Sequence, residues 1–172
     1  MEHVVLVDEQ DNAIGTMEKQ QAHVEGILHR AFSIFIFNSE KKLLLQKRAS
    51  TKYHCGGLWT NTCCSHPRET ENILDAANRR LQEEMGMNCE LKPIFSFVYK
   101  AEFENGLTEH EFDHVLLGLS DQTPELNLEE VEDFRYIGLE ELQTEIKEAP
   151  QNFTPWFLIA LNRVTEYIAN QS

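Results

Sequence analysis

Apolar and polar residues alternate with a period of two in several segments of the chain, and this period is typical of β-strands. The segment "HRAFSIFIFN" is rich in β-branched and aromatic residues, "SEKK" reads as a turn, and "LLLQKR" resumes the apolar pattern. Together these segments predict a β-hairpin. Two later segments, "IFSFVYK" and "TEHEFDHVLLGL", alternate around the turn-like "FENG", and "DFRYIGL" predicts a further strand.

Three other segments have the period of an α-helix. Thr70 is a candidate N-cap and Gly86 a stop signal for "ENILDAANRRLQEEMGM", in which apolar residues recur at Ile73, Ala77, Leu81 and Met85. "LEELQTEIKE" is predicted to be helical. In "TPWFLIALNRVTEYIAN", Thr154 fits an N-cap and Pro155 the first helical position, which predicts a closing amphipathic helix.

This order of strands and helices favours an α/β sandwich. The chain has 172 residues, of which 41% are hydrophobic, and that length can bury one sizeable core without dividing. No repeat or Pro/Gly/Ser linker interrupts it. We therefore expect a single domain over residues 1–172, as a monomer or weak dimer.

The N-terminal segment and the cysteines indicate the cellular compartment of the protein. The N-terminal "MEHVVLVDEQ" lacks a basic region followed by an apolar run, and no apolar window is long enough to cross a bilayer. A soluble, cytoplasmic protein without a membrane partner is expected. In the reducing cytosol the four cysteines are expected to be thiols or ligands: Cys55, Cys63, Cys64 and Cys89.

The formal net charge of −14 argues against a general nucleic-acid or membrane surface, because such polyanions need a basic field. The acidic residues of the second half are most simply a solvated face. The first half differs, since many of its basic residues lie near the unusual motifs. These basic residues are compatible with binding of a small anionic substrate in that region.

In the predicted strand "TEHEFDH", Glu109 and Glu111 are two residues apart and so point to the same face, with His110 and His114 on the other. Paired carboxylates repel each other, and a cation or a shared proton relieves the repulsion. The pair therefore fits a metal or acid–base role. A solvated pair on an edge strand is an equal alternative on this fragment alone.

The stretch "WTNTCCSHP" sets two cysteines beside a histidine. In an extended segment Cys63 and Cys64 point apart, whereas Cys64 and His66 share a face. If His66 converges with His23, His29 and the two strand carboxylates, they would form a site for zinc, manganese or magnesium. A non-catalytic metal module is a rival interpretation, although its four ligands would come awkwardly from one stretch: Cys55, Cys63, Cys64 and His66.

The helical segment from Glu71 to Glu84 resembles the Nudix helix, in which carboxylates on one face hold divalent cations against a diphosphate. Ser65 stands at the first glycine position of that motif, and Arg80 at the second position of its Arg-Glu pair. A metal-binding carboxylate is thus replaced by a cation, which counts against hydrolysis. A Nudix pyrophosphohydrolase is kept as the alternative, and an exposed acidic turn is the simpler interpretation of Glu83 and Glu84 alone.

The motifs "WTNTCCSHP", "HRAFSIFIFN", "EHEFDHVL" and "TPWF" together resemble type I isopentenyl diphosphate isomerase, in matching order over nearly the whole chain. The resemblance implies the Nudix α/β/α sandwich with a mixed β-sheet. It also implies that the protein interconverts isopentenyl and dimethylallyl diphosphate for isoprenoid synthesis.

The resemblance assigns roles to individual residues. Catalysis would fall to Cys64, Glu111 and Tyr99. A second divalent metal, Mn²⁺ or Zn²⁺, would have the ligands His23, His29, His66, Glu109 and Glu111. Mg²⁺ would be held by Glu84, and the substrate would be bound by Lys19, Arg48, Lys52, Arg80 and Trp156. Where the family has an aromatic-Pro-Gly sequence, this chain has Cys55-Gly56-Gly57.

Overall fold

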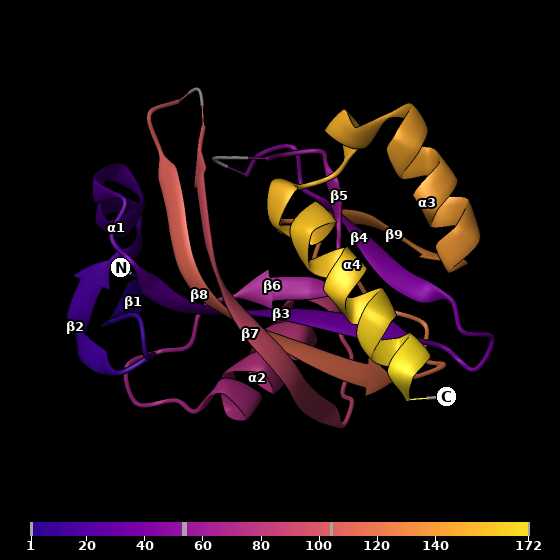
Figure 1. Ribbon diagram of the computed structural model, residues 1–172, viewed down its shortest axis with the longest axis horizontal. Coiled ribbons are helices and arrows are strands. Elements are labelled where there is room, and N and C mark those ends of the chain that lie inside the picture. Colours follow the sequence, from indigo (N-terminus) through magenta and orange to yellow (C-terminus); the bar gives the residue numbers. More distant parts are fainter. Residues whose placement is uncertain (1, 53–54, 104, 172) are drawn as a thin grey trace.

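A computed structural model describes residues 2–52, 55–103 and 105–171. Its strands join in one mixed sheet (Figure 1). They are β1 His3–Val7, β2 Ala13–Glu18, β3 His29–Phe37, β4 Leu43–Arg48, β5 Trp59–Thr60, β6 Cys63–Ser65, β7 Leu91–Glu102, β8 Thr108–Leu119 and β9 Val131–Ile137. The helices are α1 Lys19–Glu25, α2 Ile73–Met85, α3 Leu139–Glu148 and α4 Pro155–Asn170, with a short 3₁₀ turn at Pro150–Asn152.

The pairing of the strands confirms the predicted elements and makes the sheet mixed. β7 and β8 form a long antiparallel hairpin, with Glu104 of the expected turn outside the described residues. β8 also runs parallel to β3, from His29 opposite Glu111 to Phe37 opposite Leu119. β3 and β4 are joined by the expected turn but pair only at Phe37 and Leu43. β4 then pairs mainly with β9. The hairpin is therefore splayed, and where the two strands diverge β3 pairs with β6 and β4 with β5.

The two faces of the sheet explain why "HRAFSIFIFN" is apolar without interruption. Phe32, Ile34 and Ile36 belong to a buried cluster with α2, whereas Phe35 and Phe37 belong to a second cluster with α4. Successive strand residues point to opposite faces, so a strand covered on both sides is apolar at every position. Figure 1 shows α2 and α4 on opposite sides of the sheet. The predicted α/β/α sandwich is confirmed.

The predicted cap of the first long helix is wrong. α2 begins after Asn72, whose side chain accepts a hydrogen bond from the Asp75 amide, so Thr70 is not its N-cap. Both residue types cap helices well, and the sequence pattern did not separate them. Thr154 does precede α4, but its hydroxyl bonds to Thr60 at 2.7 Å instead of capping the helix.

The N-terminal elements β1, β2 and α1 were not predicted. α1 begins after Glu18, whose carboxylate accepts hydrogen bonds from the amides of Gln20 and Gln21, and it ends at Gly26 in the left-handed conformation. This short helix carries Lys19 and His23 to the edge of the sheet beside β8. Within the described residues, no helix combines the length and the apolar character needed to cross a membrane.

Candidate active site

One pocket collects most of the residues selected from the sequence. It lies where α1, β4, β6, α2, β8 and the start of α4 meet, and its walls include Lys19, Arg48, Lys52, Cys64, His66, Arg80, Glu84, Glu109, Glu111 and Trp156. His23, His29 and Tyr99 complete the set from buried positions behind these walls. Residues widely spaced in the sequence are therefore gathered around one cavity.

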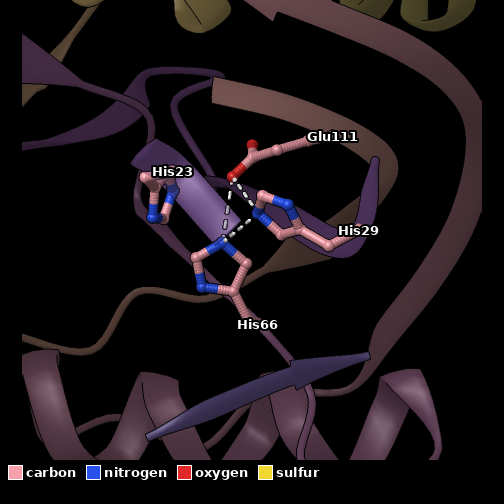
Figure 2. A group of neighbouring side chains, drawn as sticks. All are labelled: His23, His29, His66 and Glu111. Atoms are coloured by element: carbon pink, nitrogen blue, oxygen red, sulfur yellow. Dashed lines mark hydrogen bonds and ion pairs between the residues drawn. The ribbon is translucent and has the colours of Figure 1, made fainter. Parts of the chain in front are cut away.

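Three histidines and one carboxylate converge beside this pocket (Figure 2). The Nε2 atom of His66 lies 2.9 Å from Glu111 Oε2 and 3.3 Å from His29 Nε2. His29 Nε2 is 3.5 Å from the same carboxylate oxygen. With His23, one ligand atom from each of the four residues lies within 4.8 Å of the others, and all four are buried. The cluster has the donor atoms and the size of a metal site.

The hydrogen bonds behind the cluster fix how two of its rings are presented. The Nδ1 atom of His23 lies 2.8 Å from the Lys19 carbonyl oxygen, and that of His29 lies 2.9 Å from the Ile27 carbonyl oxygen. A carbonyl can only accept, so Nδ1 carries the proton in both rings. In the neutral rings Nε2 then has a free lone pair, as in metal-binding histidines.

The pKa values of the cluster respond to burial and to one another. Burial lowers the pKa of His66 to about 4, so its imidazole is neutral near pH 7. Burial also opposes charge on His29, but the hydrogen bond and charge of Glu111 outweigh it and raise the pKa of His29. Burial would raise the pKa of Glu111, yet the two imidazoles hold it well below its usual range. Glu111 is thus a carboxylate at neutral pH.

Glu109 takes a different position from the other predicted metal ligands. It lies on the same face of β8 as Glu111, is buried, and lines the pocket. The four residues whose ligand atoms lie within 4.8 Å of one another do not include it. The structure therefore brings together His23, His29, His66 and Glu111 and leaves Glu109 at the pocket wall. None of the cysteines belongs to this group, which removes the cysteine-based metal module among the described residues.

Glu84 is separate from the His/Glu cluster. Its carboxylate accepts hydrogen bonds from Arg80 Nη2 at 2.9 Å, from Gln46 Nε2 at 3.2 Å and from the Cys63 thiol at 3.5 Å. It is 3% exposed. The floor of the pocket therefore presents one buried, well-supported carboxylate.

The adjacent cysteines point to opposite sides of β6. Cys64 lines the pocket, whereas Cys63 is fully buried in the cluster under α2. All four cysteines are free thiols. Burial raises the pKa of Cys64, and Glu84 and Glu111 raise it further, while Arg48 lowers it. Additional positive charge near Cys64 would favour its thiolate.

The aromatic residues close the pocket on the side of α4. Tyr99 of β7 lies opposite Glu111 of β8. The Tyr99 ring packs edge to face against Trp156, with the ring centroids 6.5 Å apart. The guanidinium of Arg48 lies over the Trp156 ring at 5.2 Å. Burial and the neighbouring carboxylates raise the pKa of Tyr99, so its hydroxyl keeps its proton.

Three of the predicted diphosphate-binding cations, Lys19, Lys52 and Arg80, are paired with carboxylates. Lys52 Nζ and Arg80 Nη2 share Glu130 Oε1, at 3.3 and 2.6 Å. Lys19 Nζ lies 3.3 Å from Glu2 Oε2. These carboxylates hold the three cations at the pocket.

Sequence reasoning missed several residues of the site. Glu2 and Glu130 lie outside every motif, and only their contacts reveal them. Gln46 and Asp113 stand within apolar strands, where a buried polar residue is the available signal. Asp113 continues the acidic face of β8 and accepts a hydrogen bond from Ser33, and burial raises its pKa well above its usual range.

Solved structures share the fold. A structure from Deinococcus radiodurans superposes with a TM-score of 0.71 at 22% identity and covers 86% of this chain and 90% of its own. A diadenosine tetraphosphate (Ap4A) hydrolase from C. elegans gives a TM-score of 0.59 at 17% identity, with 82% and 98% covered. At these identities the likeness supports the fold alone.

Sequence relatives are much closer. The model of the NUDIX domain matches residues 27–157. Isopentenyl-diphosphate Delta-isomerase 2 of Aromatoleum aromaticum is 53% identical, covering 95% of this chain and 86% of its own length. The isopentenyl-diphosphate Delta-isomerase of Pectobacterium atrosepticum is 51% identical, with 95% and 92% covered. The chain therefore belongs to the NUDIX family and, within it, to the isopentenyl-diphosphate Delta-isomerases.

Proposed function

We propose that this protein interconverts isopentenyl diphosphate and dimethylallyl diphosphate in the pocket around Cys64. The observation that carries the proposal is the meeting of a thiol, a His/Glu cluster and several cationic side chains in one cavity. Membership of the isomerase family gives this meeting its chemical meaning. We further expect the enzyme to act in the cytoplasm, where its four thiols stay reduced, as a monomer or weak dimer.

The diphosphate has no reactive role and serves to place the hydrocarbon. The substrate would be bound through its phosphates by four cations that line the pocket and carry the positive charge that phosphate oxygens attract: Lys19, Arg48, Lys52 and Arg80. Binding would replace the carboxylate partners that Lys52 and Arg80 share. The five-carbon chain is then held between Cys64 and Glu111.

Two divalent cations fit the residues present. The three Nε2 atoms and the Glu111 carboxylate suit Mn²⁺ or Zn²⁺, since imidazole and carboxylate are ligands that both accept. Glu84 is the proposed protein ligand of Mg²⁺, which commonly uses one or two carboxylates together with substrate phosphates. When bound, these cations supply positive charge that favours the anionic forms of neighbouring groups.

The reaction needs a proton donor and a proton acceptor on opposite sides of the substrate. Tyr99 keeps its proton beside the ionised Glu111, and this pair delivers one proton to the terminal alkene carbon, which leaves a tertiary carbocation. The Cys64 thiolate removes a proton from the carbon that lies between the cationic carbon and the carbon bearing the diphosphate, and the new double bond forms between that carbon and the former cationic carbon. The Glu111–Tyr99 pair loses one proton and Cys64 gains one, and exchange with solvent restores both.

The carbocation is proposed to lie beside Trp156, whose aromatic face attracts positive charge. Arg48 already lies over this ring and would oppose a second cation. A bound diphosphate would neutralise Arg48, so the ring becomes a suitable neighbour for the carbocation only with the substrate in place. Closing the pocket would also keep water away from the cation.

A Nudix pyrophosphohydrolase is the alternative from another enzyme class. The relatives that match over nearly the full length bear the isomerase name, whereas the hydrolase structure resembles this chain in fold alone. Arg80 also stands where the hydrolase motif has a carboxylate. These observations favour the isomerase.

Deuterium incorporation separates the two activities. The purified protein is incubated with isopentenyl diphosphate, Mg²⁺ and Mn²⁺ or Zn²⁺ in deuterated water, and the products are followed by NMR and mass spectrometry. Deuterium-bearing dimethylallyl diphosphate is the expected product. Release of phosphate without isomerisation, or an unchanged substrate, would overturn the proposal.

A further inference from the structure

The Glu84 carboxylate is oriented by donors from three elements. Gln46 of β4 donates to Oε1, while Cys63 of β6 and Arg80 of α2 donate to Oε2. Arg80 itself faces the pocket and is paired with Glu83 and Glu130 as well. When Arg80 turns to a diphosphate, the two buried donors are the ones that remain behind Glu84.

The Gln46 amide is fixed before it reaches Glu84. Its Nε2 atom also donates to the Thr62 carbonyl oxygen at 2.9 Å, so its two hydrogens have two different acceptors. Gln46 is 1% exposed, and a buried amide in a strand is costly unless it is paired in this way. Its second hydrogen is therefore aimed at Glu84 by the backbone of residue 62.

Cys63 reaches Glu84 because of the alternation along β6. Its neighbour Cys64 faces the pocket, so Cys63 must point toward α2, where its sulfur meets Glu84 Oε2 at 3.5 Å. Cys63 belongs to a cluster of buried hydrophobic residues that includes Phe32, Ile34 and Leu81. A valine or alanine would satisfy the packing, whereas a thiol adds a donor aimed at a carboxylate.

We propose that Cys63 and Gln46 are positioning residues that orient the Glu84 carboxylate for Mg²⁺ and the diphosphate, an inference that rests on the proposed function. Mg²⁺ requires near-ideal octahedral geometry, so a carboxylate free to rotate binds it less well. The groups that orient ligands typically change metal affinity by about 10–100-fold when they are removed. The adjacent cysteines thus serve one site from two sides of a strand.

The matched pair Cys63→Ser and Cys63→Ala tests the proposal. Serine keeps a donor at this position, and alanine removes it. Binding of Mg²⁺ is measured by calorimetry in the presence of inorganic pyrophosphate, and the Mg²⁺ concentration for half-maximal isomerase activity is measured separately. Thermal unfolding without Mg²⁺ reports stability. Gln46→Met, which removes the amide at similar length, is the parallel variant, and Glu84→Gln gives the effect of losing the carboxylate charge.

A positioning role and a packing role for Cys63 predict opposite orders for the effects of Cys63→Ala and Cys63→Ser. For a positioning residue, Cys63→Ala should weaken Mg²⁺ binding about tenfold, Gln46→Met at least as much, and Cys63→Ser should stay near the wild type. For a packing residue, Cys63→Ser should be the more damaging change, because it buries a hydroxyl among apolar side chains, and it should act on unfolding alone. Equal Mg²⁺ affinity in Cys63→Ala and the wild type would overturn the inference.

The calorimetric measurement also separates this inference from the proposed function. If the wild type binds Mg²⁺ with pyrophosphate but does not isomerise, the proposed reaction is wrong, and the order of the Cys63 variants still decides the positioning role. If the wild type isomerises and Glu84→Gln leaves the Mg²⁺ requirement unchanged, Glu84 is not the magnesium ligand and the inference fails with it.

Discussion

Tyr99 and Glu111 lie directly opposite each other on the antiparallel strands β7 and β8. Their side chains share the face of the sheet that carries His29, because His29 is the parallel partner of Glu111. The Tyr99 hydroxyl is buried and, among the described residues, makes no hydrogen bond to protein atoms. A proton donor is therefore held beside a carboxylate that two imidazoles keep ionised.

Glu111→Gln should abolish most of the activity, because it keeps the size of the side chain but removes its charge and its capacity to carry a proton. General acid–base groups contribute about 10²–10⁴-fold, and a metal ligand is lost as well. Turnover and bound metal are measured together. Glu102→Gln, at the exposed end of β7, is the control. A variant that retains turnover would exclude Glu111 as the acid.

Cys64→Ser should stop isomerisation while fold and metal content stay intact, since a hydroxyl is far less acidic than a thiol. Cys63→Ser should keep turning over. A thiol-directed alkylating analogue of the substrate should label Cys64, and mass spectrometry identifies the labelled cysteine. If Cys63→Ser is the inactive variant, the assignment of the two faces of β6 is wrong.

Arg80→Glu should weaken substrate binding, because a guanidinium that can bind two phosphate oxygens becomes an anion. It should also lower the free energy of unfolding, since Glu84 and Glu130 lose their shared partner. The Michaelis constant and the unfolding midpoint are therefore measured for the same samples. Arg79→Glu is the matched control, one position away and paired with Glu71 and Glu83. Equal Michaelis constants in both variants would remove Arg80 from the substrate site.

Metal removal should destabilise the protein. A ligand that binds the folded state alone adds about 2.7 kcal/mol at one hundred times its Kd, so chelation should lower the unfolding temperature and Mn²⁺ or Zn²⁺ should restore it. Replacing His23, His29 and His66 together should remove the response. His110→Gln, on the opposite face of β8, should keep it. A response that survives the triple replacement would place the metal elsewhere.

The Glu71–Arg79 pair predicts an acid-dependent part of the stability. The hydrogen bond from Arg79 at 2.7 Å lowers the pKa of Glu71 below its value in the unfolded chain. The pair therefore stabilises the fold at pH values above the unfolded-state pKa of Glu71. Its contribution disappears as the pH falls through the folded-state pKa of Glu71. Glu71→Gln should lower stability at pH 7 and flatten its loss between about pH 5 and pH 3. Parallel unfolding curves at all pH values would contradict this.

The features that depend on local backbone geometry follow from the amino-acid sequence alone. Period-two and period-four patterns located the later strands and α2 to α4, because strand and helix fix where successive side chains point. The same rule placed Glu109 and Glu111 on one face and separated Cys63 from Cys64. The sequence pattern did not distinguish Asn72 from Thr70 as the N-cap of α2, since both residue types can accept a hydrogen bond from a helix amide.

Which distant residues meet depends on how the whole chain packs. His23 comes from a short helix without a sequence signature, His29 from the start of β3, and His66 from the loop after β6, and their convergence on Glu111 depends on the parallel pairing of β3 with β8. Glu130 likewise reaches Lys52 and Arg80 from outside every motif. Such contacts depend on strand pairing and packing between segments far apart in the chain, whereas a sequence pattern records only the preferences of neighbouring residues.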